Sequence, residues 1–170
     1  MKKNLKLLVS LALVTLTFSI PQIPSSQAME RETERIPNTK LHTNVVYNIK
    51  HRVSSAHLDA NGEGTKVYML GNAQQDNPYQ QWSFLPAGNN FYNIKHRASG
   101  AHLDANESGT EVYMLGNAQQ NNQYQQWSLV PAGGNFYNIK HRVSNAHLDA
   151  KGNGKEVYML GNAQPNNQYQ

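Results

Sequence analysis

The chain repeats itself at a fixed interval, and this repetition limits the folds open to it more than any other feature of the sequence. The hexapeptide Tyr-Asn-Ile-Lys-His-Arg recurs every 45 residues, beginning at Tyr47, Tyr92 and Tyr137. Residues 47–91 and 92–136 are identical at 35 of 45 positions without a gap, and residues 137–170 match the first unit at 26 of 34. The three units are therefore expected to share one local structure.

Each segment of the repeat is typical of β-structure. Residues 47–53 alternate between two faces, as a half-buried strand does. Residues 54–64 are predicted to form a turn, a short strand and a second, glycine-containing turn. Residues 65–71 and 80–88 provide two further strands. Because no stretch has apolar residues at helical spacing over three turns, the chain is predicted to be all-β.

Four short strands in a unit of 45 residues fit two architectures. A β-propeller uses units of this length but needs at least about four blades. Three units instead predict a β-trefoil, a six-stranded barrel capped by three hairpins. The third unit reaches Gln170 before its fourth strand. We expect that strand to come from a longer chain or, alternatively, from the N-terminal segment or a second chain by strand addition.

Residues 1–28 have the features of a secretory signal peptide. A basic start precedes an apolar run that is too short to span a bilayer, and small residues follow near position 28. A membrane anchor is the alternative, although no stop-transfer pattern follows the run. We therefore expect a secreted, extracellular protein of bacterial type, in which residues 29–46 form a polar linker before the repeats.

Charge and cysteine content exclude several functions. Removing Lys2, Lys3 and Lys6 with the leader lowers the formal net charge from +4 to +1, so no basic surface for nucleic acid is expected. The chain has no cysteine, which excludes disulfides, thiolate chemistry and Cys-based zinc sites.

Strand alternation predicts one chemically distinctive face in each unit. If Val67 and Met69 point into the core, then Tyr68 and Leu70 stand on the outer face. Leu58 is the natural core residue of its strand, which turns Asp59 outward, and Tyr79 returns toward this face after a polar loop. A carboxylate accepts hydrogen bonds from hydroxyls, and aromatic or aliphatic groups pack on the C–H face of a pyranose. The face therefore suits a sugar.

The order of motifs in the repeat resembles the ricin-type β-trefoil lectin family. Leu58-Asp59 ends one strand, Val-Tyr-Met-Leu forms the next, and Gln-Gln-Trp closes the unit at Trp82 and again at Trp127. Within that family the repeat is most similar to those of high-mannose-binding actinomycete lectins. The resemblance covers residues 47–170. It implies a ricin B-type carbohydrate-binding domain in which Trp82 anchors the core and Gln80 ties the loop backbone.

The same resemblance implies one shallow sugar site in each repeat. The loop between the third strand and the Tyr is two residues longer than in the related lectins, so that each unit offers two candidates for the loop Asn. The implied carbohydrate-binding residues are Asp59, Tyr68, Leu70, Asn72, Asn77 and Tyr79 in the first unit, Asp104, Tyr113, Leu115, Asn117, Asn122 and Tyr124 in the second, and Asp149, Tyr158, Leu160, Asn162, Asn167 and Tyr169 in the third.

Other functions are disfavoured by the sequence. The repeated histidines could line a threefold axis and bind zinc, but their number follows from the duplication, and no metal or other cofactor is expected. The repeated aspartates lie in separate units, which leaves no paired acid and base, so the protein is not expected to be an enzyme. The expected partners are glycans or glycoconjugates on a cell surface or polysaccharide. The alternatives are a targeting module for a separate toxin or hydrolase chain and, more weakly, a protease inhibitor.

Overall fold

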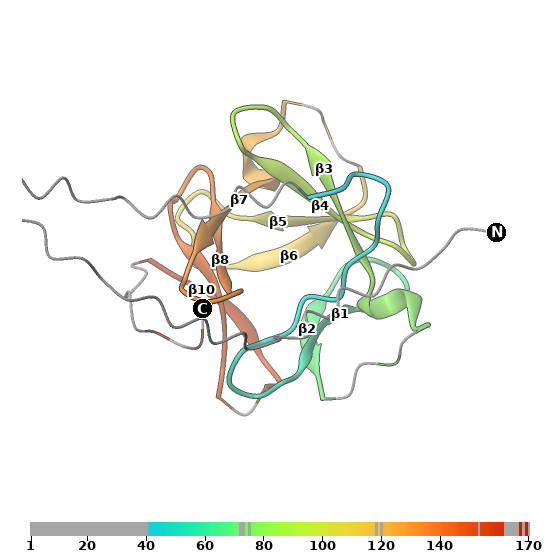
Figure 1. The fold of residues 1–170 in the computed structure, drawn as a ribbon. Helices are drawn as coiled ribbons and strands as arrows, with labels where there is room; N and C mark the ends of the chain where they lie inside the picture. The colour runs from blue at the N-terminus through green and yellow to red at the C-terminus, as the bar shows by residue number, and fades with distance from the viewer. Residues whose placement is uncertain are drawn as a thin grey trace, which may run out of the picture. The chain divides into compact units, whose positions relative to one another are not determined.

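The computed structural model describes residues 41–170 apart from positions 72, 73, 75, 118, 120, 153, 162–166, 168 and 170. Leu41–Gln170 forms one compact unit. The described strands and short 3₁₀ helices follow one another in the order β1 (His57–Ala60), β2 (Val67–Leu70), η1 (Pro78–Gln80), β3 (Trp82–Pro86), β4 (Tyr92–His96), β5 (His102–Ala105), β6 (Val112–Leu115), η2 (Gln123–Gln125), β7 (Gln126–Pro131), β8 (Tyr137–His141), β9 (His147–Ala150) and β10 (Val157–Leu160) (Figure 1). In this described part no helix is long and apolar enough to cross a membrane.

Each unit contributes one antiparallel hairpin in the same register. The hairpins are β1–β2, β5–β6 and β9–β10, and in the first of them Leu58 pairs with Met69 and Asp59 with Tyr68. Leu58 and Met69 are buried, so this pair faces the core and the Asp59–Tyr68 pair lies on the opposite face. The alternation predicted from the sequence is confirmed. Strands β2, β6 and β10 also contact one another, which places the three hairpins around a common axis.

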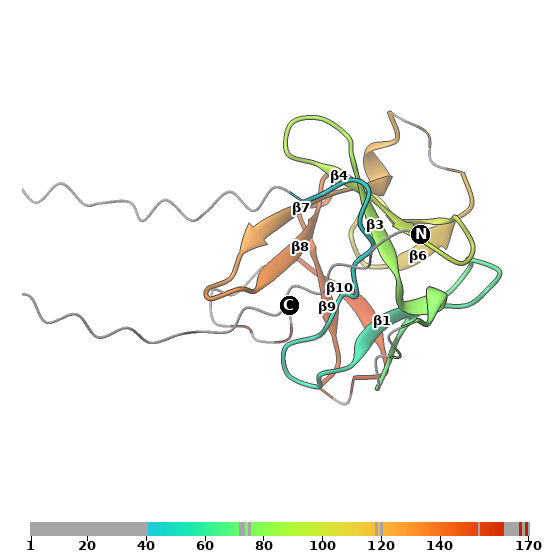
Figure 2. The ribbon, with the colours of Figure 1, turned by 45° about the vertical axis from the view of Figure 1, so that its right-hand side comes forward.

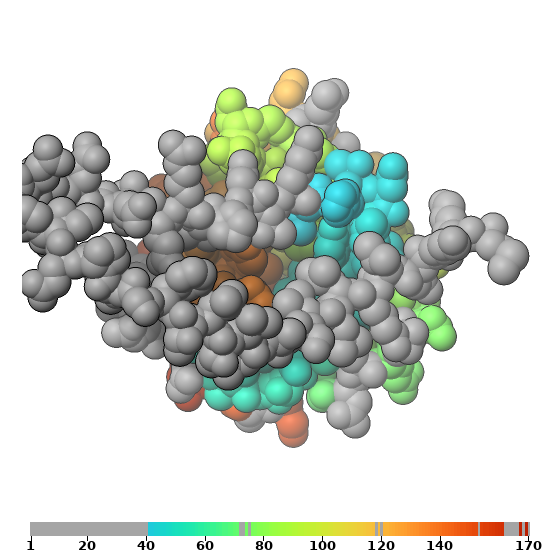
Figure 3. All heavy atoms as spheres, viewed as in Figure 1, coloured from blue at the N-terminus to red at the C-terminus, as the bar shows by residue number. Residues whose placement is uncertain are grey.

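The barrel strands connect consecutive units. Strand β3 pairs with β4, and β7 pairs with β8, so the fourth strand of one unit forms a hairpin with the first strand of the next (Figure 2). The strand predicted at the start of each unit is present as β4 and β8. In the first unit it is reduced to bridges at Tyr47–Trp82 and Lys50–His57, because no described strand pairs with its outer edge. The segment preceding it, cyan in Figure 3, lies at the surface, although Leu41 packs against the core.

Two tryptophans confirm the predicted core anchors. Trp82 and Trp127 are fully buried, and their indole N–H groups donate to the carbonyls of Leu58 (2.9 Å) and Leu103 (3.0 Å). A buried Trp needs such a partner for its N–H. Around them lie the buried aliphatic residues of all three hairpins, so the core, the strands and the threefold repetition together establish the predicted all-β trefoil.

The three units, called lobes 1, 2 and 3 below, pack against one another in cyclic order. A Cβ added at Gly64 of lobe 1 would collide with Ser99 and Ala101 of lobe 2. The equivalent Gly109 of lobe 2 lies against Ser144 and Ala146 of lobe 3, and Gly154 of lobe 3 lies against Ser54 and Ala56 of lobe 1. All three glycines have positive φ. The contact is therefore repeated at all three boundaries.

Candidate functional site

The predicted site begins with an aspartate that is buried rather than exposed. Asp59, Asp104 and Asp149 are only 2%, 1% and 2% exposed, so the expectation that these carboxylates stand on an open surface is wrong. Alternation gives the face on which a side chain lies, but not what covers that face. Here the covering comes from the same lobe, because η1 packs against β1 and η2 against β5.

Hydrogen bonds hold these carboxylates in place. In each hairpin the tyrosine side chain forms a hydrogen bond with the aspartate on the opposite strand, as between Tyr113 and Asp104. The Gln125 side chain also forms a hydrogen bond with Asp104. Burial raises the pKa of Asp104 and Asp149, and burial together with the adjacent carboxylate raises the pKa of Tyr113 and Tyr158. The Oδ1 atoms of Asp104 and Asp149 have no hydrogen-bond partner among the described residues. A buried acceptor without a partner is costly, so a bound hydroxyl would be favourable there.

Exposed apolar side chains surround this carboxylate. Leu70 is 47% exposed and Tyr79 is 43% exposed, and both have exposed equivalents in the other lobes. The Tyr79 ring lies against Gly62, where an added Cβ would be 3.2 Å from Tyr79 Cε1. Tyr169 lies in the same way against Gly152, at 3.0 Å, whereas lobe 2 has Glu107 at this position. Each lobe therefore presents a Leu and a Tyr beside a buried acceptor.

The two candidate loop asparagines differ in what the structure says of them. Asn77 is the N-cap of η1, and its Oδ1 accepts from the Tyr79 N–H at 3.0 Å. Asn122 and Asn167 accept from Tyr124 and Tyr169 at the same distance. These asparagines therefore position the site tyrosines. Asn167 Nδ2 also donates to Asp149 Oδ2 at 3.3 Å.

The other candidates are Asn72, Asn117 and Asn162. Asn72 and Asn162 lie outside the described residues. The Asn117 carbonyl accepts from Gln125 Nε2 at 3.5 Å, and Gln80 Oε1 accepts from the Gln74 N–H at 3.2 Å. The predicted role of Gln80, to tie the loop backbone, is confirmed.

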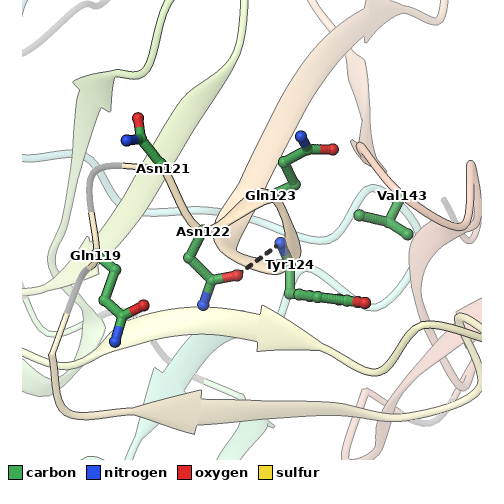
Figure 4. Close-up of a pocket in the computed structure, with 6 residues that line it drawn as sticks. All are labelled: Gln119, Asn121, Asn122, Gln123, Tyr124 and Val143. Carbon is green, nitrogen blue, oxygen red and sulfur yellow. Dashed lines mark hydrogen bonds between the residues drawn. The ribbon is translucent and has the colours of Figure 1, made fainter.

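A shallow cleft of about 490 Å³ adjoins Tyr124. It is lined by Gln119, Asn121, Asn122, Gln123, Tyr124 and Val143 (Figure 4). Sequence reasoning identified only two of these residues. It missed Val143 because that residue belongs to lobe 3, and reading one repeat at a time cannot reveal a neighbour from the next.

In lobes 1 and 2, a histidine of the next lobe contacts the backbone carbonyl of the site tyrosine. His96 Nε2 lies 3.0 Å from the Tyr79 carbonyl oxygen, and His141 Nε2 lies 3.0 Å from that of Tyr124. The Nδ1 atoms of both rings are 2.8 Å from a serine hydroxyl. At the third boundary the rings of His51 and Tyr169 stack at a centroid distance of 6.1 Å. Burial lowers the pKa of all three histidines.

The described part of the chain contains no group of three His, Cys, Asp or Glu residues that could hold a metal ion. His51, His96 and His141 make the lobe-boundary contacts described above, whereas His57, His102 and His147 begin the hairpin strands β1, β5 and β9. The chemistry of the site is that of hydrogen-bond acceptors, amides and apolar faces.

Fold and side chains together define a β-trefoil in which each lobe has a buried aspartate in its hairpin and an exposed Leu and Tyr. The sequence matches the profile of ricin-type β-trefoil lectin domain-like proteins over residues 35–115 and 78–160. The chain belongs to this family, whose lectin-like members are generally not enzymes. No protein of curated function shows significant sequence similarity to the chain.

Solved structures support the fold. The designed threefold-symmetric protein ThreeFoil superposes with a TM-score of 0.62 at 24% identity, covering 74% of this chain and 94% of its own. The Haemophilus ducreyi cytolethal distending toxin gives 0.59 at 13% identity, with 84% of each chain covered. The Polyporus squamosus lectin, bound to the epitope Neu5Aca2-6Galb1-4GlcNAc, gives 0.60 at 18% identity and covers 74% of this chain and 46% of its own.

Proposed function

We propose that the protein is a secreted, non-enzymatic lectin that binds glycans through one shallow site in each lobe. The observation that carries this proposal comes from lobes 2 and 3, where a buried carboxylate oxygen, Oδ1 of Asp104 and of Asp149, has no partner among the described residues and belongs to a lobe with an exposed Leu and Tyr. Membership of a lectin-like family supports carbohydrate as the ligand class.

The chemistry of such a site follows from its parts. A sugar hydroxyl donates to the aspartate, replacing the missing partner of its buried oxygen with a charge-assisted hydrogen bond. The C–H face of the sugar packs on the exposed tyrosine and leucine. Because Tyr113 bonds the same aspartate, the carboxylate is held in position before the sugar arrives. Since its Oδ1 is buried, the side chains that cover it must shift to admit the sugar hydroxyl.

Affinity is expected to come from several sites at once. Single shallow sites bind weakly, and three sites on one rigid domain gain by effective concentration when a branched or clustered glycan reaches more than one. High-mannose glycans are the favoured ligand, from the resemblance of the repeat, and galactose-type sugars are the second choice. Glycoconjugates on a cell surface or polysaccharide are the corresponding partners.

A glycan array followed by calorimetry tests the proposal. The test variant carries Asp59→Asn, Asp104→Asn and Asp149→Asn, which keep the shape of the side chain and remove its charge. We expect each site to lose about 10- to 100-fold in affinity. Glu63→Gln is a matched control, because Glu63 is exposed and lobe 2 has the uncharged Ser108 there. Absence of glycan binding by the parent, or unchanged binding by the triple variant with its fold intact, would contradict the proposal.

A targeting module is the second candidate function. The similarity to the Haemophilus ducreyi cytolethal distending toxin supports it, because that neighbour is itself a toxin. In this case a separate toxin or hydrolase chain would bind the domain and be carried to a glycan surface. Affinity purification of the tagged full chain from the medium of its producer should then recover a stoichiometric second protein. Recovery of the chain alone would favour a free-standing lectin, and its mass would show whether residues 1–28 are removed.

A further inference from the structure

We infer that each sugar site continues across the lobe boundary, so that a second sugar residue rests against a side chain of the next lobe. That side chain is Ala98 for lobe 1, Val143 for lobe 2 and Val53 for lobe 3. The inference deepens the proposed lectin function and rests on it. It concerns the length of glycan that each site recognises and predicts that the three sites are not equivalent.

The cleft beside Tyr124 crosses the lobe boundary and shares Asn122 and Tyr124 with the proposed sugar site of lobe 2. Its lining joins the loop residues Gln119 to Tyr124 of lobe 2 to Val143 of lobe 3. In Figure 4 the Asn122 side chain points down toward the pale yellow strands of lobe 2, and the Tyr124 ring extends to the right, below Val143. Tyr124 therefore lies between the hairpin that carries Asp104 and the wall formed by the next lobe.

The position of Val143 is fixed by its neighbours in the chain. His141 Nε2 lies 3.0 Å from the Tyr124 carbonyl oxygen, and Ser144 lies against Gly109. Both residues flanking the 142–143 pair are thus held to lobe 2. Because the boundary is packed on both sides, the wall is part of a preformed surface rather than a mobile loop, and it costs little to order on binding.

The lining suits a second sugar ring. Valine methyl groups and the tyrosine ring provide apolar faces for C–H groups, and the side chains of Gln119, Asn121 and Gln123 provide amide donors and acceptors for hydroxyls. Lobe 1 has Ala98 in place of Val143 and Pro78 in place of Gln123. Lobe 1 also has Asp76 in place of Asn121. It therefore has a smaller apolar side chain from the next lobe and two amides fewer at this position, although its Asp59, Tyr68, Leu70 and Tyr79 are the same residue types as in lobe 2.

The test isolates lobe 2 in the full chain by Asp59→Asn with Asp149→Asn. Affinities are measured by calorimetry for methyl α-mannoside and α-1,2-mannobiose, with methyl galactoside and lactose as a second pair. In this background Val143→Ala should weaken disaccharide binding about 3- to 10-fold and change monosaccharide binding less than about twofold. Val130→Ala is the matched control, because Val130 is half-buried like Val143 but lies on β7 outside the cleft lining, and it should change neither affinity.

The reciprocal variant tests a gain. With lobe 1 isolated by Asp104→Asn and Asp149→Asn, Ala98→Val should raise disaccharide affinity and leave monosaccharide affinity unchanged. Equal effects of Val143→Ala on both sugars, or no effect on either, would overturn the cross-lobe subsite and leave the lectin proposal standing. If the lobe-2 parent binds neither sugar pair, the proposed function fails at this site, and the subsite fails with it.

Discussion

The glycine at each lobe boundary offers a sharp test of how the trefoil is held together. Gly109 has a φ of +64°, and a Cβ added there would lie 2.5 Å from Ser144 Cβ and 2.8 Å from Ala146 Cβ. Two costs therefore add in Gly109→Ala. Left-handed backbone costs an L-residue about 1–2 kcal/mol, and overpacking costs about 1–3 kcal/mol. We expect a loss of roughly 2–5 kcal/mol, a large part of a typical domain stability of about 5–15 kcal/mol.

Two other glycines in lobe 2 separate these costs. Gly133 also has a positive φ, +88°, but an added Cβ would meet nothing within 4 Å, so Gly133→Ala reports backbone strain alone. Gly116 has neither a positive φ nor a neighbour within 4 Å. Gly116→Ala should be neutral or stabilise by up to about 1 kcal/mol, because alanine restricts the unfolded chain.

Urea denaturation followed by tryptophan fluorescence measures all three variants. The expected order of stability is Gly116→Ala, then Gly133→Ala, then Gly109→Ala, with at least about 1 kcal/mol between the last two. If Gly109→Ala and Gly133→Ala unfold at the same urea concentration, then the packing of Gly109 on Ser144 does not contribute, and the reasoning is refuted. Gly154→Ala should behave like Gly109→Ala, which would show that lobe 3 packs on lobe 1 as lobe 2 packs on lobe 3.

Three further outcomes are expected. Trp127→Ala should lower the free energy of unfolding by about 3–5 kcal/mol, since it empties a fully buried site and leaves the Leu103 carbonyl without its donor; a loss under about 1 kcal/mol in urea denaturation would contradict this. Stability should fall as the pH is lowered from 7, because burial lowers the pKa of six histidines and the unfolded chain takes up their protons first. For His102, whose pKa is lowered to about 4, the loss extends from its ordinary value of 6.5 down to that pH. Asp104 and Asp149 act in the opposite sense, because their raised pKa favours the folded state once they protonate, so the melting temperature should drop mainly between about pH 7 and 5; a melting temperature that rises over this range would be inconsistent. Finally, His141→Phe should weaken glycan binding at lobe 2 by about tenfold and spare lobe 1, because only the former loses the contact to the Tyr124 carbonyl. His96→Phe should give the reverse pattern, and equal losses at both sites in calorimetry would rule out local positioning.

The fold could be predicted largely from local pattern. The register of Leu58 with Met69 and of Asp59 with Tyr68 follows from period-two alternation, and both buried tryptophans follow from the closing motif of the repeat. The register and the buried tryptophans depend on residues within one unit of 45 residues, so the alternation of apolar residues and the closing motif are enough to predict them.

The site was less predictable because the burial and contacts of its residues depend on which segments pack over the hairpin strands. The burial of Asp104 requires η2 to fold back over β5, and a 3₁₀ turn of three residues is too short to produce a periodic signal. The capping role of Asn77 follows from a local turn and could have been recognised from its position before Pro78. Contacts such as His141 with Tyr124 arise only when the barrel closes, which no single repeat encodes.

The cyclic contacts between lobes also bear on how such a protein could originate. Gly64, Gly109 and Gly154 lie at equivalent positions on one surface of their lobes. The serine and alanine that contact each glycine lie on a different surface of the next lobe. The interface is therefore head-to-tail, and it closes into a ring after three steps. A lone ancestral unit would carry both surfaces of this interface and satisfy neither. Three separate copies could satisfy all of them as a symmetric trimer, and gene duplication would then need only to join the copies end to end, leaving the interfaces as they were.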